Sequence, residues 1–422
     1  MNTRSDAREL DPTLRDAGNA WRRRIVATLD GMHGGTVRLR DAHGDVLLGR
    51  ADGAAPLAVA ITVHDEAFYR RIALNGSVGA GEAYIDGQWD CDDLVALVRL
   101  MVRNRDRLDA LETGLARIGA VLLRGWEALR PNTRGGSRRN IAAHYDLGNA
   151  LFGLFLSDDM MYSSALYADP AESLEAASFR KLDTICRKLR LQDGDRVVEI
   201  GTGWGGFAIH AARHYGCHVT TTTLSREQRD LALERIAAAG LGDRIDVLLE
   251  DYRDLRGRYD KLVSIEMVEA IGAAQLPTYF GKIAALLADD GLALVQAITI
   301  EDHRYARALK EVDFIKRHVF PGSFIPSVSA MLGAMAARSD LGLVHLQEIG
   351  DSYALTLREW RRRFEGRRDA LAALGYDERF VRLWRFYLCY CEGGFLERSI
   401  GNVQMLFARP GYRGSRPAAA AL

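Results

Sequence analysis

Long apolar runs are absent from this sequence of 422 residues, and none approaches the roughly 18 residues that a membrane-spanning helix needs. A secretory signal is also missing, because its apolar stretch is replaced near the start by charged residues: Arg4, Asp6, Arg8, Glu9 and Asp11. Cysteine is scarce, and the five cysteines include no C-x-x-C pair, which argues against a disulfide framework. We therefore expect a cytoplasmic protein with reduced thiols.

An excess of either charge is missing too, since Lys+Arg and Asp+Glu both number 56. No overall field attracts nucleic acid, and we expect no nucleic-acid partner; an anionic partner must be met by a local patch. Such a patch lies between Arg117 and Arg139, where PNTRGGSRR has the composition of a linker. This stretch is either a solvated connector or a basic surface that faces anionic phospholipid heads.

The N-terminal quarter predicts a small α+β unit. Residues 36–63 contain three stretches typical of short strands, TVRLRD, DVLLG and LAVAITV. Apolar residues at helical spacing follow Asp65 and again Asp93, which predicts two helices. We predict an accessory domain over 1–125, a basic linker over 126–140, a catalytic domain over 141–410 and a tail over 411–422.

From residue 171 onward, helical and strand patterns alternate. The strands RVVEI, CHVTTTTL, RIDVLLE, KLVSIEM and LALVQAITI are separated by amphipathic helical stretches. This alternation predicts an α/β fold with a doubly wound, mostly parallel sheet whose ligands bind at the carboxyl ends of the strands. LVHLQEI and NVQMLFARP come late and suit an antiparallel hairpin at one edge of the sheet.

The stretch VVEIGTGWGG (197–206) has the glycine spacing of a nucleotide-binding turn. A nicotinamide site would want an acid about 20 residues later, but that strand ends in Thr221, Thr222 and Thr223 without one. Acids lie elsewhere, at Glu199 before the first glycine and at Asp251 after the next strand. This arrangement favours S-adenosylmethionine, although Glu199 could instead be a structural carboxylate that caps the glycine turn.

Seven motifs, in order, resemble the cyclopropane fatty acid synthase family, whose members use S-adenosylmethionine to modify cis double bonds in acyl chains. The motifs are HYDLGNALFGLFLSDDMMYSSALY, EIGTGWGGFA, TTTLSREQ, EDYRDL, SIEMVEAIG, DFIKRHVFPGSFIPSV and YCEGGF. The resemblance runs from His144 to Arg409, and NGSVGAGEAYIDGQWDCDDL resembles the N-terminal domain of the phospholipid-acting members. It implies a Rossmann-like class I methyltransferase fold. The candidate cofactor-binding residues are Tyr162, Ser163, Glu199, Gly201, Gly203, Gly205, Thr223, Leu224, Ser225, Gln228, Asp251 and Tyr252.

The resemblance also implies a bound bicarbonate that takes a proton during ring closure. Its ligands would be Ser164, Glu269, Gln296, the backbone of Ile298, and Tyr353. Ser164 and Gln296 depart from the cysteine and histidine of many relatives; both can donate a hydrogen bond to an anion, but a possible imidazolium charge is lost. Cys391 matches the position of a cysteine often regarded as active, and we expect it to be structural. No metal site is expected.

The resemblance predicts an enzyme that transfers a methylene group from S-adenosylmethionine to unsaturated acyl chains of phospholipids and forms cyclopropane fatty acids. The alternative on the same lipids is methyl or methylene branching without ring closure. A catalytically silent scaffold that binds S-adenosylmethionine and a methyltransferase for a soluble amine also remain open. The expected partner is a membrane surface, met peripherally from the inner face; a homodimer stays open.

Overall fold

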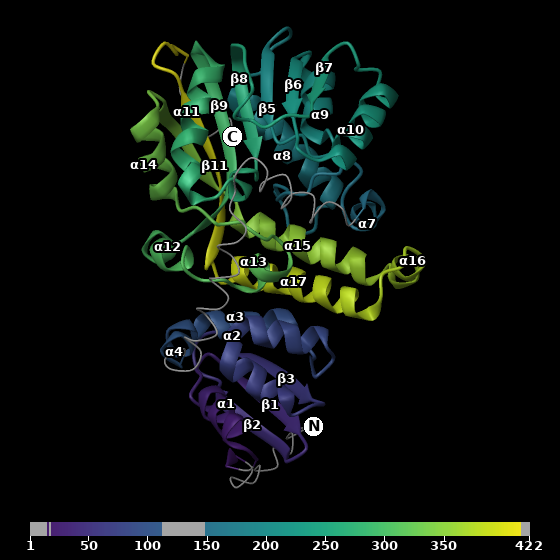
Figure 1. Cartoon of the computed structure of the whole chain (residues 1–422), viewed down its shortest axis with the longest axis vertical. Coiled ribbons are helices and arrows are strands. Elements are labelled where there is room, and N and C mark those ends of the chain that lie inside the picture. The colour runs from purple at the N-terminus through teal and green to yellow at the C-terminus, as the bar shows by residue number, and fades with distance from the viewer. Residues whose placement is uncertain (1–14, 17, 112–147, 415–422) are drawn as a thin grey trace, which may run out of the picture. The chain divides into compact units, whose positions relative to one another are not determined.

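The structure is a computed structural model that describes residues 15–16, 18–111 and 148–414 (Figure 1). The predicted basic linker lies outside these ranges. The described residues within Met1–Gly125 and Tyr376–Glu397 form one compact unit, and those within Trp126–Gly375 and Arg398–Leu422 form a second. Residues 376–397 therefore group with the N-terminal unit, although the sequence led us to expect them in the catalytic domain; the domain boundaries stay a prediction.

The first unit is the expected α+β unit, built on a four-stranded sheet in the order β2-β1-β3-β4. Its strands are β1 (Gly35–Asp41), β2 (Gly44–Arg50), β3 (Leu57–Val63) and β4 (Trp89–Cys91). Its helices are α1 (Ala20–Asp30), α2 (Ala67–Ile85), α3 (Leu94–Arg103), α4 (Arg105–Leu111) and α17 (Glu378–Leu396). The sequence predicted β1, β2, β3, α2 and α3, but not the short β4.

Helix α17 packs against α2 and α3 although almost 300 residues separate them in the chain. Its Gly393 lies so close to α3 that a Cβ atom there would come within 2.7 Å of a Val98 methyl group. Arg382 extends over the ring of Tyr84, 4.0 Å from its centre. Gly393, a glycine of the YCEGGF motif, therefore allows a close contact between α17 and α3.

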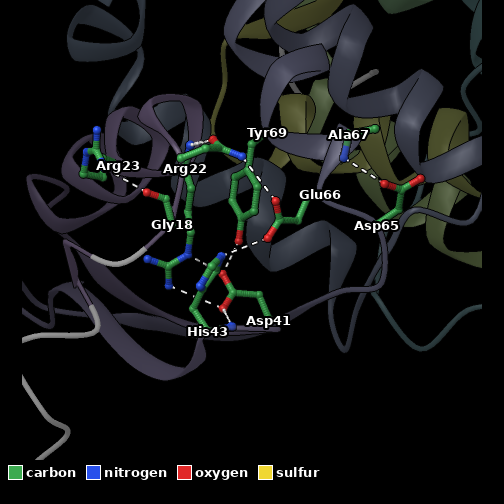
Figure 2. A network of polar contacts seen from close by, with 10 residues as sticks. Gly18, Arg22, Arg23, Asp41, His43, Asp65, Glu66, Ala67 and Tyr69 are labelled. Carbon is green, nitrogen blue, oxygen red and sulfur yellow. Dashed lines mark hydrogen bonds and ion pairs between the residues drawn. The ribbon is translucent and has the colours of Figure 1, made fainter.

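A buried ion pair joins α1 to the end of β1 in this unit (Figure 2). Arg22 Nε lies 2.6 Å from Asp41 Oδ2, and the two side chains are 1% and 2% exposed. Tyr69 also donates a hydrogen bond to Asp41, and the His43 backbone N–H donates another at 2.9 Å. Burial works to raise the pKa of Asp41, but the hydrogen bonds from Arg22 and Tyr69 outweigh it and hold that pKa below its ordinary value.

The second unit contains the predicted α/β fold, with a seven-stranded sheet in the order β10-β11-β9-β8-β5-β6-β7 (Figure 1). The strands are β5 (Arg196–Ile200), β6 (His218–Thr222), β7 (Ile245–Leu248), β8 (Tyr259–Ile265), β9 (Leu287–Ile300), β10 (Gly342–Glu348) and β11 (Ile400–Ala408). The adjacent strands in the series β7-β6-β5-β8-β9 pair in parallel. Strand β11 pairs antiparallel with both β9 and β10. The doubly wound sheet with an antiparallel edge is confirmed.

Helices cover both faces of this sheet, which explains why its strands are apolar on both sides. Val197 faces a cluster with α8 and α9, whereas the next residue, Val198, faces a cluster with α11 and α14. The longer helices of the unit are α8 (Leu174–Leu189), α9 (Gly206–Tyr215), α10 (Arg226–Ala238), α11 (Leu276–Leu286), α14 (Val328–Arg338) and α15 (Gly350–Glu365). The shorter helical segments are α7 (Asn149–Gly153), α12 (Asp302–Ala308), α13 (Phe314–His318), α16 (Arg368–Ala373), η2 (Val268–Ala270) and η3 (Ala273–Gln275).

Candidate active site

The glycine turn follows β5 at the carboxyl edge of the parallel strands. Gly201, Gly203 and Gly205 have φ angles of 104°, 51° and 83°, a region that favours glycine. A Cβ on Gly201 would also lie 3.2 Å from Met267. Helix α9 begins directly after Gly205, and no side chain caps it. The turn therefore aims backbone N–H groups at the place where the resemblance puts the cofactor.

The turn after β6 carries four of the candidate cofactor residues at the same edge. Thr223 Oγ1 donates a hydrogen bond to Gln228 Oε1 at 2.9 Å, and Ser225 caps α10 by accepting from the Gln228 N–H at 3.2 Å. Leu224, between them, is half-buried. This turn is fixed by its own hydrogen bonds, so its geometry does not depend on a ligand.

The turn after β7 carries Asp251 and Tyr252. The Asp251 carboxylate holds Arg253 through two contacts of 2.8 and 2.6 Å. Burial raises the pKa of Tyr252 to about 12, and its hydroxyl has no hydrogen-bond partner among the described residues. Tyr252 is therefore a polar group at this edge that a ligand could satisfy.

Glu199 is buried beneath the glycine turn. Thr221 Oγ1 donates to its Oε2 at 2.6 Å, and Thr202 Oγ1 lies 2.8 Å from the same hydroxyl. Burial raises the pKa of Glu199 to about 8. These contacts are those of a carboxyl group that braces the turn, and the ligand role of Glu199 stays a prediction.

Lys181 contacts a candidate cofactor residue, and the sequence did not lead us to expect it there. Its ammonium is fully buried and donates to Ser163 Oγ at 2.8 Å, and burial lowers its pKa to about 8. A signal was present, because Lys181 interrupts the apolar stripe that Leu174, Ala177 and Ile185 form on α8. Lys181 fixes the hydroxyl of a candidate cofactor residue.

Glu266 is the second missed residue, and it lies at the centre of the predicted bicarbonate ligands. Its φ angle is 49°, which is uncommon for a residue with a side chain. Its Oε1 accepts from the Ser164 N–H at 3.0 Å, from Gln296 Nε2 at 2.8 Å and from Asn402 Nδ2 at 2.5 Å. Its Oε2 accepts from the Tyr353 hydroxyl at 2.8 Å. The sequence shows two glutamates in SIEMVEAIG but cannot tell which one reaches these donors.

Glu269, the predicted glutamate of that motif, lies in η2 beside this cluster. Its Oε1 accepts from the Ile298 N–H at 2.6 Å, whereas its Oε2 is buried without a hydrogen-bond partner among the described residues. Burial, and then the neighbouring charge of Glu266, raise the pKa of Glu269 to about 8. At neutral pH Glu269 is therefore mostly a neutral acid.

The structure thus brings together Ser164, Glu269, Gln296, Ile298 and Tyr353, but around a carboxylate of the protein itself. Ser164 N, Gln296 Nε2 and the Tyr353 hydroxyl donate to Glu266, and the Ser164 hydroxyl donates to the Ala165 carbonyl at 2.8 Å. A bicarbonate added here would meet a negative carboxylate and donors that are already in use. These residues do not fit the bound ion that the resemblance implied.

An aromatic cluster surrounds Tyr162. Its ring centre lies 5.1 Å from that of Phe152 and 5.3 Å from that of Trp360, and Trp360 lies 6.2 Å from Tyr353. The aromatic cluster therefore extends to a residue that contacts Glu266. Aromatic faces in such a place can stabilise a positive charge by roughly 2 kcal/mol when they are desolvated.

Cys391 lies on α17 in the first unit, whereas the other five candidate catalytic residues lie in the second unit. Its side chain is half-buried. Among residues 15–16, 18–111 and 148–414, no group of three His, Cys, Asp or Glu side chains could hold a metal ion. In the same ranges, every helix is too short or too polar to cross a bilayer.

Comparison with known proteins first defines the class. The structure resembles a cyclopropane synthase MmaA2 from Mycobacterium tuberculosis (TM-score 0.60, 27% identity, 64% of this chain and 98% of that chain). It resembles equally a mycolic acid cyclopropane synthase CmaA1 complexed with SAH and CTAB (TM-score 0.60, 28% identity, 64% and 98%). The protein is an S-adenosylmethionine-dependent methyltransferase with the class I fold.

The family follows from the sequence matches. Residues 133–405 match the model described as mycolic acid cyclopropane synthetase, and the chain belongs to this family. It is 39% identical to the tuberculostearic acid methyltransferase UfaA1 of Mycobacterium tuberculosis over 86% of each chain. It is 35% identical to the cyclopropane-fatty-acyl-phospholipid synthase of Escherichia coli K12 over 88% of this chain and 94% of that one.

Proposed function

We propose that this enzyme methylates cis double bonds in unsaturated acyl chains of phospholipids, and that the product is a chain with an exocyclic methylene group, or a methyl-branched alkene, without a cyclopropane ring. The observation that favours a product without a ring is the Glu266 carboxylate, which accepts hydrogen bonds from the donors that the resemblance assigned to bicarbonate. The similarity to a tuberculostearic acid methyltransferase supports the same choice.

S-adenosylmethionine, when bound, supplies a methyl group: the alkene electron pair forms the new carbon–carbon bond, and the pair of the broken S–CH₃ bond stays on sulfur. The residues of the chain then manage the positive charge left on the acyl carbon. Tyr162 and Trp360 present aromatic faces and keep water away, and Glu266 supplies a fixed negative charge. An exocyclic methylene group forms when a hydride shifts from the methylated carbon to the cationic carbon and the new methyl group then loses a proton, whose C–H electron pair forms the double bond. In its ionised form, Glu269 takes that proton at Oε2, the oxygen without a partner among the described residues.

Cyclopropane formation is the second candidate function. The 35% identity to the Escherichia coli synthase and the family description support it. Both products can lose the proton of the newly added methyl group. Ring closure loses it directly, whereas an exocyclic methylene group forms only after a hydride has shifted from the methylated carbon to the neighbouring cationic carbon. The product therefore depends on the fate of the cation after methyl transfer, and the two candidate functions share the methyl donor.

The deciding experiment combines the purified protein, vesicles of phospholipid with cis-monounsaturated chains, and methyl-labelled S-adenosylmethionine. We expect labelled lipid that is heavier by one CH₂ group and that gives exocyclic methylene signals in proton NMR. High-field cyclopropane signals alone would overturn the branched product in favour of the second candidate. Lipid without label would overturn both, and an amine substrate screen would follow.

A further inference from the structure

A line of buried hydrogen bonds connects Glu266 with Lys188 on α8, a helix that packs against β9 of the sheet. Lys188 Nζ, on α8, donates to Gln404 Oε1 on β11 at 2.6 Å. Gln404 Nε2 donates to Gln296 Oε1 on β9 at 3.0 Å, and Gln296 Nε2 donates to Glu266 Oε1 at 2.8 Å. The Lys188, Gln296 and Gln404 side chains are all at most 1% exposed.

The register of the strands builds this line. Gln404 and Gln296 are direct partners in the antiparallel pair β11–β9, and Gln296 is paired with Ile265, the residue before Glu266. Gln347 on β10 is the partner of Gln404 on the other side and also accepts from Lys188, at 2.5 Å. Gln347 is therefore a side branch that does not lead to Glu266.

The groups at the two ends of the line, the Lys188 ammonium and the Glu266 carboxylate, determine how the two amides between them are oriented. An ammonium only donates, so Gln404 must turn its oxygen to Lys188 and its NH₂ group to Gln296. Gln296 must then turn its oxygen to Gln404 and its NH₂ group to Glu266, whose ionised carboxylate only accepts. Each amide could otherwise be turned over at little cost, and a turned Gln296 would set its oxygen against the carboxylate.

We propose that Lys188 is a positioning residue for the reaction: through Gln404 and Gln296 it aims an N–H at Glu266 and so holds that carboxylate beside Glu269 and the acyl cation. The proposal rests on the proposed function, because it concerns the charge that Glu266 supplies there. Lys188 itself contacts neither the candidate cofactor residues nor Glu266 in any hydrogen bond of the described chain.

The test is a pair of matched variants, Gln404→Glu and Gln347→Glu. Both replace an amide that accepts from Lys188 by a carboxylate that accepts from it equally well. Only Gln404→Glu removes the NH₂ group that Gln296 Oε1 needs, which makes Gln296 turn over and repel Glu266. We expect Gln404→Glu to lower kcat by about tenfold or more with the KM for lipid and for S-adenosylmethionine unchanged, and Gln347→Glu to keep the wild-type kcat.

Lys188→Met and Lys188→Arg form the second arm. Methionine removes the ammonium but suits a buried site, so we expect a stable protein with a lowered kcat, and we expect arginine, which also only donates, to restore part of it. Equal kcat values for Gln404→Glu and Gln347→Glu, or a wild-type kcat for Lys188→Met, would overturn the positioning role. Wild-type protein that labels no lipid would instead overturn the proposed function.

Discussion

Two glutamates three residues apart, Glu266 and Glu269, have different hydrogen-bond surroundings. Glu266 accepts four hydrogen bonds, whereas Glu269 accepts one from a side of the site where its second oxygen has no partner among the described residues. Burial, and then the charge of Glu266, raise the pKa of Glu269 to about 8, as in a group that exchanges a proton near neutral pH. Glu266 is thus held by its donors, whereas Glu269 lies beside it with an oxygen that is available to accept a proton.

Glu266→Gly tests whether the protein carboxylate stands in for a bound anion. Glycine suits the φ angle of 49°, and its introduction frees the donors of Ser164, Gln296 and Tyr353. We expect wild-type turnover to be the same in carbon dioxide-free buffer and with added bicarbonate, and the variant to be active only with bicarbonate. A wild-type enzyme that needs bicarbonate would contradict the interpretation that the Glu266 carboxylate takes the place of a bound anion.

Glu269→Gln should separate catalysis from cofactor binding. The amide keeps the size of the carboxyl group but cannot take a proton, so turnover should fall by about 100-fold or more while the affinity for S-adenosylmethionine stays nearly unchanged. Steady-state labelling and calorimetric titration measure the two quantities. Equal losses in both would move Glu269 into the cofactor site.

The same variant should change how stability depends on pH. Since the folded state raises the pKa of Glu269 from 4.5 to about 8, the stability that its neutral form contributes is full below 4.5 and is lost as pH rises toward 8. Glutamine is neutral at every pH, so the free energy of unfolding of Glu269→Gln should fall less over that window. Urea unfolding at several pH values measures both slopes; parallel curves would mean that Glu269 is ionised in the folded protein.

At the scale of elements, a serine that caps a helix can be compared inside and outside the candidate cofactor turn. Ser225 caps α10 within the candidate cofactor turn, and Ser173 caps α8 outside it, accepting from the Ala176 N–H at 3.2 Å. Either serine replaced by alanine should lower the free energy of unfolding by about 1 kcal/mol. Only Ser225→Ala should also weaken S-adenosylmethionine binding, because Thr223 and Gln228 lie in its turn. Equal affinities in the two variants would remove this turn from the cofactor site.

At the scale of the whole molecule, the first unit depends on a buried charge pair. Asp41→Ala leaves Arg22 buried without that partner, and we expect a loss of about 3–5 kcal/mol in the unfolding of this unit. Asp45→Ala is the control, since Asp45 pairs with Arg38 and Arg40 at the surface and should cost at most about 1 kcal/mol. Urea unfolding followed by circular dichroism compares them, and similar midpoints would show that the buried pair contributes little.

We also expect the whole chain to bind membranes at their surface, because the substrate we propose is a phospholipid and the predicted linker over 126–140 is basic. Co-sedimentation with anionic vesicles should be strong at low salt and weaker at high salt, since the attraction is electrostatic. Vesicles of neutral lipid are the matched control. Binding that changes with neither the salt concentration nor the lipid charge would indicate that apolar surface makes the contact instead.

The sequence determined the type and order of the elements, because apolar spacing and turn residues are local signals. RVVEI became β5 at the same residues. The late strands became the antiparallel edge. Local spacing likewise located the glycine turn and the turn that carries Asp251.

Only the tertiary structure decided which side chains meet. Glu266 contacts donors from residues 164, 296, 353 and 402, and no pattern within SIEMVEAIG distinguishes it from Glu269. Lys188, Gln404 and Gln296 form a line because β11 pairs with β9 in one register, and a shift by one residue would turn every side chain to the opposite face. Periodicity along a chain is local, whereas hydrogen bonds between distant segments exist only once packing has brought those segments together.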